Sequence, residues 1–147
     1  MSRRAKRTDG LRSGFEGTVK AALDAQKIKY TYESEAIPYV VPASKHRYIP
    51  DFTLTLSTMV IEAKGKFDAA TRKKMMLVIE QNPDRDIRLL FMRNNKLSKT
   101  SKTTYGEWCD SKGIKWAVAV DGAIPDSWVQ ENKEKDNRSK KRNRSKK

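Results

Sequence analysis

The chain has 147 residues, and its 32 lysines and arginines against 18 aspartates and glutamates give a formal net charge of +14. Its longest apolar runs have five residues, against the ~18 that a membrane-spanning helix needs, and its first residues lack the apolar segment of a signal peptide. The short apolar runs exclude a membrane protein. Because Cys109 is the one cysteine, the sequence also excludes a secreted disulfide scaffold and a cysteine-built zinc finger, and it indicates a cytoplasmic location.

The first half of the chain predicts a basic arm, one helix and several strands. Residues 1–12 hold five basic and one acidic side chain and form the arm. Ser13 and Glu16 have the spacing of a capping box, so the local interpretation of Glu16 is a cap for a helix over 14–26. The remaining expected elements are a strand over 28–32, an extended piece over 38–42, a turn over 42–46 and strands over 48–56 and 58–63.

The second half predicts helices that alternate with strands. A helix capped by Asp68 carries Met75, Met76 and Ile79 on its buried side. The expected elements are, in order, this helix to 81, a central buried strand over 87–92, a helix over 104–112, a strand over 114–120 and a helical turn from Pro125. This order predicts a single α/β domain with a mixed sheet, over residues 13–130.

Most of the excess positive charge lies in the two terminal segments. Residues 131–147 hold nine basic and three acidic side chains, and we expect a basic disordered tail there. Segments like this tail and the arm over 1–12 bind polyanions by counterion release, which favours nucleic acid as a partner. The alternative is that both segments only keep the protein soluble or direct it to a compartment.

The chemistry-bearing residues are two carboxylates on neighbouring predicted strands. Asp51 follows a proline on one strand, and Glu62 and Lys64 lie on the next, where a spacing of two puts both side chains on one face. Carboxylates hold Mg²⁺, which polarises a phosphate and lowers the pKa of an attacking water, and a nearby lysine can hold that water. The Ala63 carbonyl is a further candidate ligand. The alternative is that Glu62 and Lys64 form a solvated strand face.

Several segments between Arg12 and Trp128 together carry a resemblance to a known family. They resemble the phage endonuclease I family, small nucleases that resolve four-way (Holliday) DNA junctions. The segments include Arg12-Ser13-Gly14-Phe15-Glu16, Pro38-Tyr39-Val40-Val41-Pro42, Tyr48-Ile49-Pro50-Asp51-Phe52, Glu62-Ala63-Lys64-Gly65 and Thr104-Tyr105-Gly106-Glu107-Trp108-Cys109.

The resemblance implies a restriction-endonuclease-like α/β fold of the PD-(D/E)xK type in an intertwined, domain-swapped homodimer. It implies that Glu16 is catalytic as well, and that it joins Asp51, Glu62 and Lys64 of the other chain. The expected cofactor is Mg²⁺, for which Mn²⁺ can substitute, held by Asp51, Glu62, Glu16 and the Ala63 carbonyl. The expected DNA-binding residues are Arg12, Arg72, Lys73 and Lys74, and the alternative for the last three is a solvated helix face.

The function that follows is a structure-selective endonuclease that hydrolyses phosphodiesters in branched DNA. The glycines form neither a P-loop nor a dinucleotide fingerprint, so no nucleotide cofactor is expected. Two alternatives stay open, a non-catalytic nucleic-acid-binding protein and a restriction-type nuclease that cuts ordinary duplex. A non-catalytic protein would be indifferent to EDTA and to Lys64→Ala in every activity. Competition between branched and linear DNA would distinguish a restriction-type nuclease from a junction-specific one.

Overall fold

The structure is a computed structural model that describes residues 14–41 and 43–145, with side chains up to residue 135. Its centre is a five-stranded mixed sheet. The strands on one side of the sheet pair antiparallel, whereas β5, β6 and β7 are parallel to one another. In spatial order the strands are β1 (Tyr30–Tyr32), β4 (Phe52–Leu54), β5 (Val60–Lys64), β6 (Ile87–Phe91) and β7 (Lys115–Val118).

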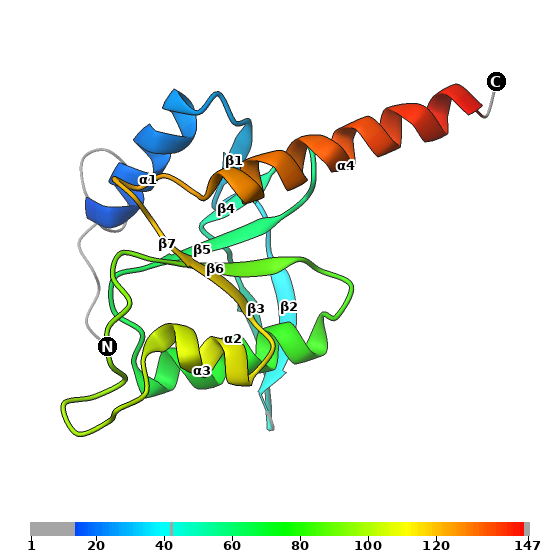
Figure 1. The fold of residues 1–147 in the computed structure, drawn as a ribbon. Helices are drawn as coiled ribbons and strands as arrows, with labels where there is room; N and C mark the ends of the chain where they lie inside the picture. Colours follow the sequence, from blue (N-terminus) through cyan, green and yellow to red (C-terminus); the bar gives the residue numbers. More distant parts are fainter. Residues whose placement is uncertain (1–13, 42, 146–147) are drawn as a thin grey trace.

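Helices cover both faces of this sheet (Figure 1). The helices α1 (Gly14–Ala25) and α4 (Asp126–Ser145) lie on one face, and α2 (Ala69–Gln81) and α3 (Tyr105–Ser111) lie on the other. All five residues of β6 are buried, as the predicted central strand requires, because successive side chains enter the two opposite cores. The predicted α/β class and mixed sheet are therefore confirmed.

The helix ends follow the local sequence signals. Asp68 caps α2 by accepting a hydrogen bond from the Thr71 N–H, and Thr104 caps α3 in the same way. Gly113 has a φ of +69° where the chain leaves α3. On the buried side of α2 the prediction is partly wrong, because Met75 and Val78 are the fully buried residues there.

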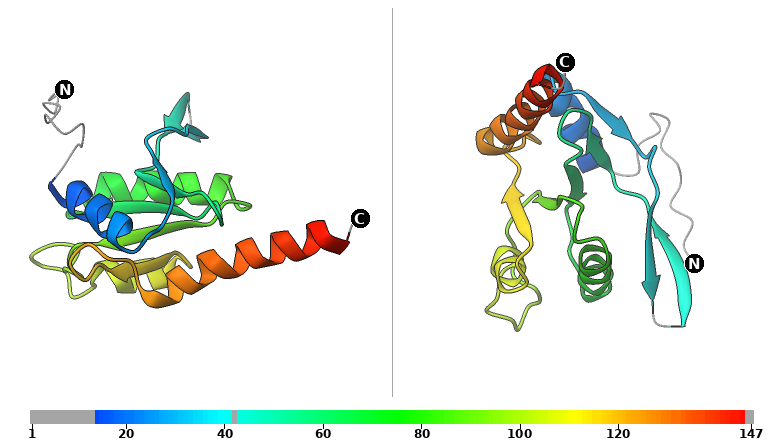
Figure 2. Two further views of the ribbon diagram at one scale, coloured as in Figure 1. Left: turned by 90° about the horizontal axis from the view of Figure 1, so that it is seen from above. Right: turned by 90° about the vertical axis from the view of Figure 1, so that its right-hand side faces the viewer.

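A separate hairpin, β2 (Ile37–Val41) with β3 (Ser44–Tyr48), lies against α2 (Figure 2). The expected turn over 42–46 is therefore wrong in extent, since residues 44–46 pair with β2. The expected strand over 48–56 is also interrupted after Tyr48, and β4 begins at Phe52. Pro50, which has no N–H to donate to a ladder, lies in this interruption.

The last helix is much longer than the expected helical turn. Helix α4 continues to Ser145 through most of the segment for which a disordered tail is expected, and it projects from the body of the protein (Figure 2). Asn132 is buried and accepts a hydrogen bond from the Ser57 N–H, so contacts with the domain extend past residue 130. Within the described residues, no helix is long and apolar enough to cross a membrane.

Candidate active site

Asp51 and Glu62 face each other across the β4–β5 pair. The register pairs Phe52 with Ile61, which places Asp51 opposite Glu62. The Ala63 N–H donates to Asp51 Oδ2 over 2.9 Å, and the Asp51 N–H donates to Glu62 Oε2 over 3.3 Å. Both side chains are buried. The antiparallel pairing therefore brings together two carboxylates that are eleven positions apart.

Lys64 completes the predicted trio at the end of β5. Its Nζ lies 3.1 Å from Glu62 Oε1, and its side chain is 29% exposed. Glu62 is thus held on both oxygens, since the Tyr48 hydroxyl donates to Oε2. Burial and the negative charge of Glu62 raise the pKa of Tyr48 well above its ordinary value, so this hydroxyl keeps its proton.

Glu16 reaches the same place from α1. It lies in the first turn of the helix, yet its side chain is buried, and its Oε2 accepts a hydrogen bond of 2.6 Å from the Tyr32 hydroxyl. A cap on its own helix therefore does not fully describe Glu16. In this structure it approaches Asp51 of its own chain, whereas the resemblance implies a contribution from the other chain. The capping partner Ser13 lies outside the described residues.

The structure adds Glu33, which the sequence analysis does not single out. Oxygens of Glu16, Glu33 and Asp51 lie within 4.8 Å of one another. Glu33 follows β1 with a φ of +47°, a rare backbone conformation for a non-glycine residue, and its N–H donates to the Asp51 carbonyl. In the sequence it reads as one more polar residue in an alternating strand, and no local signal separates it from its neighbours.

The surroundings of Asp51 favour a bound cation. Burial, together with the negative charges of Glu62 and Glu16, raises the pKa of Asp51 to about 8, against the opposing effects of the Ala63 N–H and Lys64. A divalent cation would offset this repulsion, and the donor set consists of the carboxylate oxygens that Mg²⁺ prefers. The residues present therefore fit the metal that the resemblance implies.

A cavity of about 280 Å³ opens beside these groups. It lies where the end of β5 meets the beginnings of α1 and α2, so Glu16 and Lys64 face a space that solvent can enter. Its lining residues are Phe15, Glu16, Ala63, Lys64, Gly65, Lys66, Asp68 and Thr71.

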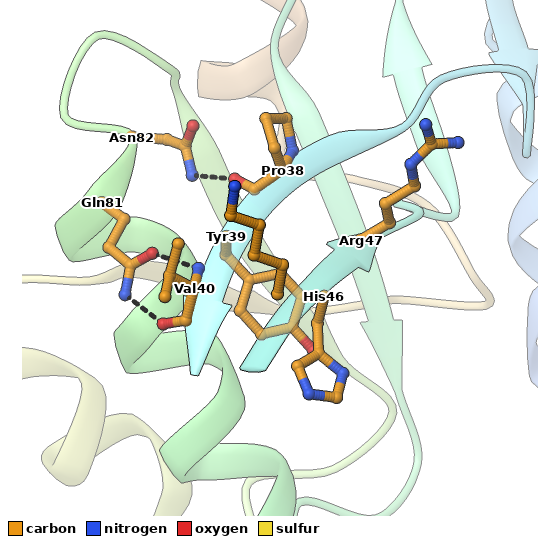
Figure 3. Close-up of a pocket in the computed structure, with 8 residues that line it drawn as sticks. Pro38, Tyr39, Val40, His46, Arg47, Gln81 and Asn82 are labelled. Atoms are coloured by element: carbon orange, nitrogen blue, oxygen red, sulfur yellow. Dashed lines mark hydrogen bonds between the residues drawn. The ribbon is translucent and has the colours of Figure 1, made fainter. Parts of the chain in front are cut away.

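A larger hollow of about 550 Å³ lies between the β2–β3 hairpin and the end of α2 (Figure 3). Gln81 bonds both the N–H and the carbonyl of Val40 there, and Asn82 donates to the Pro38 carbonyl. None of its lining residues is acidic, and none also lines the smaller cavity. The site carboxylates therefore do not line this larger hollow.

The expected DNA-binding residues fall in different surroundings. Arg72 is half-buried and donates to the Phe67 carbonyl over 2.7 Å. Lys73 and Lys74 are exposed on α2, and Lys74 Nζ lies 5.5 Å from the centre of the Tyr48 ring. Arg12 lies outside the described residues.

Carboxylates on adjacent strands, with a lysine two residues after the second, form an arrangement typical of metal-dependent nucleases. The family comparison agrees with this class, since the family model for phage endonuclease I matches residues 1–147. Endonuclease I of Escherichia phage T7 is 43% identical over 129 residues, which cover 87% of this chain and 84% of that protein. Endodeoxyribonuclease 1 of Enterobacteria phage T3 is 47% identical over 124 residues, which cover 84% of this chain and 79% of that protein. The chain belongs to the phage endonuclease I family.

Proposed function

We propose that this protein is a Mg²⁺-dependent DNA endonuclease that cuts four-way junctions and other branched DNA inside the phage-infected cell. The observation that carries the proposal is the gathering of Glu16, Asp51, Glu62 and Lys64 at the end of β5. Family membership supports it, because the two relatives are named as an endonuclease and an endodeoxyribonuclease.

In this proposal Asp51 and Glu62 hold the metal, with Glu16 and the Ala63 carbonyl as further ligands. Bound Mg²⁺ would supply Lewis-acid polarisation of the phosphate and a lower pKa for water. Lys64, partly exposed and already paired with Glu62, holds the attacking water or the charge that develops on phosphorus. Water adds to phosphorus, the bond to the 3′ oxygen breaks, and that oxygen takes a proton. The products are 5′-phosphate and 3′-hydroxyl ends.

DNA would be held by charge and shape. Lys73 and Lys74 are exposed on α2, whose first turns border the catalytic cavity, and Arg72 lies beside them. Arg12 and the basic terminal segments add phosphate contacts in the proposal. Since phosphate contacts carry no sequence information, selectivity would come from the geometry of the branch point.

We further propose the restriction-endonuclease-like, domain-swapped dimer. Two cuts across a junction need two active sites, and a dimer provides both. Helix α1 and strand β1 connect to the hairpin through residues 33–36, and this segment is the candidate hinge. Exchange of α1 and β1 between two chains would preserve their packing contacts and bring Glu16 to the other chain's Asp51.

The test is cleavage of a radiolabelled four-way junction against linear duplex of matched sequence, with Mg²⁺ or EDTA. Wild type is compared with Lys64→Ala and with Lys20→Ala, which removes an exposed lysine paired with Asp24 on α1. We expect paired cuts near the branch point with Mg²⁺, a loss of about a hundredfold or more in Lys64→Ala with junction binding retained, and wild-type activity in Lys20→Ala.

The same assay decides between the alternatives. Tight binding without cutting by the wild type, in any divalent metal, would leave a DNA-binding module and reject the nuclease. Equal cutting of the linear duplex in a competition would replace the junction enzyme by a restriction-type nuclease.

A further inference from the structure

Two tyrosine hydroxyls, from different strands, contact two of the site carboxylates. Tyr48 donates to Glu62, and Tyr32 donates to Glu16. We propose that Tyr32 and Tyr48 are positioning residues that orient these two glutamates for binding a divalent cation. The inference rests on the proposed function, because it assigns a role at the same metal site.

Tyr48 is held in place by its burial and by contacts with two other elements. It ends β3, is 1% exposed, and pairs across the hairpin with Ile37. The Lys74 ammonium lies over its ring, which ties the hairpin to α2. The hydroxyl and the Asp51 N–H both donate to Glu62 Oε2, and Lys64 pairs with Oε1. The glutamate head group is therefore held in one orientation.

Tyr32 acts on Glu16 from a different element. It ends β1, and its ring lies 5.6 Å from the ring of Phe52 in the core beneath α1. The ring position fixes the hydroxyl, which donates to Glu16 Oε2 over 2.6 Å. Tyr32 thus connects the helix that carries Glu16 to the strand pair that carries Asp51.

The physical reason for such partners is the flexibility of glutamate. A glutamate has three side-chain torsions, and a metal site loses affinity when ligands must be ordered on binding. Hydrogen bonds from rigid neighbours order the ligands beforehand, and removal of such a partner changes metal affinity or activity by about 10–100-fold.

The chain offers matched controls for both tyrosines. Tyr30 lies two positions before Tyr32, packs on the same Phe52 ring, and donates its hydroxyl to the exposed Asp24. Tyr39 lies in the same hairpin as Tyr48, with its ring 5.7 Å from His46. The variants Tyr30→Phe and Tyr39→Phe therefore remove a hydroxyl from the same strand and from the same hairpin, but neither hydroxyl contacts Glu16 or Glu62.

The experiment measures Mn²⁺ binding calorimetrically without DNA, and the Mg²⁺ dependence of junction cleavage, in all four variants and the wild type. We expect Tyr32→Phe and Tyr48→Phe to weaken Mn²⁺ binding by about tenfold or more and to raise the half-saturating Mg²⁺ concentration alike. Junction affinity in EDTA should stay unchanged, and both controls should match the wild type.

The outcomes separate the positioning role from the function. If the wild type binds metal and cuts, but Tyr32→Phe and Tyr48→Phe have unchanged metal affinity, the positioning role is wrong and the nuclease stands. If the wild type neither binds metal nor cuts, both proposals fail. Should Tyr48→Phe lower the melting temperature enough to obscure binding, the half-buried Tyr32 decides the question alone.

Discussion

At the scale of single residues, the carboxyl group of Asp51 would link stability to the proposed metal binding. Its neighbours make the charged form costly in the metal-free protein, since burial and two acidic side chains act on it together. The same arrangement would favour a bound cation at the proposed metal site, because a divalent ion would convert repulsion between carboxylates into coordination.

A pH dependence of stability follows from this raised pKa. The folded value is about 8 and the unfolded value about 3.8, so the folded state holds the proton more tightly. The contribution of Asp51 to the free energy of unfolding is fully present below pH 3.8 and is lost as the pH rises through 8. The free energy of unfolding, measured with urea in EDTA, should therefore be lower at pH 8 than at pH 5 by on the order of a few kcal/mol. In Asp51→Asn this decline should be smaller.

Mg²⁺ provides the control for that prediction. Added at pH 8, it should restore stability to the wild type and do little for Asp51→Asn, because binding to the folded state stabilises by mass action. An equal decline with pH in both proteins would show that Asp51 is not the titrating group.

The sequence predicts some of these residues and misses others for a clear reason. Asp51, Glu62 and Lys64 can be found because their spacing on paired strands expresses the chemistry directly. Glu33 and Tyr32 cannot, because each reaches the site through a contact with a residue far away in the chain. The spacing of Glu16 predicts only a cap, and the family resemblance was needed to assign it to the site.

At the scale of elements, a buried arginine fastens α4 to the sheet. Arg88 of β6 is 1% exposed and donates to Asp86 through two nitrogens and to Glu131 on α4. Its guanidinium lies 5.2 Å from the centre of the Trp128 ring. Burial acts to raise the pKa of Asp86, but the hydrogen bonds and charge of Arg88 outweigh it and hold that pKa below its ordinary value.

Arg88→Met should therefore destabilise the protein and loosen α4. The substitution leaves Asp86 half-buried without its main partner, and breaking such a pair costs about 3 kcal/mol. Urea unfolding measures the loss, and hydrogen exchange should show faster opening of α4 than of α2. Lys20→Met, which breaks an exposed pair with Asp24, should change stability too little to measure. Equal stability of both variants would contradict the fastening role.

The elements that sequence reasoning finds are those with strong local signals. Capped helices such as α2 and α3 are predicted within one or two residues, because Asp68 and Thr104 mark their beginnings. The expected extended piece over 38–42 corresponds to β2. Strand β3 is missed because its first four residues are exposed and lack an alternating apolar pattern, and its pairing with β2 holds it extended. The length of α4 is missed because its charged residues resemble a disordered segment.

At the scale of the whole molecule, the end of α4 lies away from the proposed catalytic site. Figure 1 and the left view of Figure 2 show α4 extending away from the beginning of α1. Glu16 lies in the first turn of α1. In the proposed function, phosphates bound by this end would be remote from the bond that is cut. The end of α4 can therefore contribute to affinity without touching the reaction.

Removing residues 136–147 tests this separation while sparing Glu131 and Asn132. The truncated protein should bind junctions more weakly, and the slope of log affinity against log salt should fall by about 0.9 for each phosphate that this segment neutralises in the full-length protein. Single-turnover cleavage at saturating protein should keep the wild-type rate. An unchanged salt slope would show that this segment does not bind DNA.

The proposed exchange of α1 makes a different prediction for mixed dimers. Glu16→Gln and Asp51→Asn are each expected to be inactive alone. If Glu16 acts in the other chain's site, co-refolding the two variants restores one intact site per mixed dimer, and nicking of one strand returns. If Glu16 serves its own chain, each site keeps one lesion and the mixture stays inactive.

The pairing of Gln81 with Val40 has a consequence for solubility. An exposed strand edge is a template on which another polypeptide can add, and repeated addition leads to aggregation. The side-chain amide of Gln81 offers the β2 edge the same donor and acceptor that an incoming strand would bring, and Asn82 occupies the Pro38 carbonyl beside it. Gln81 and Asn82 thus occupy backbone groups of β2 that an added strand would need, which disfavours polymerisation along this edge of the hairpin.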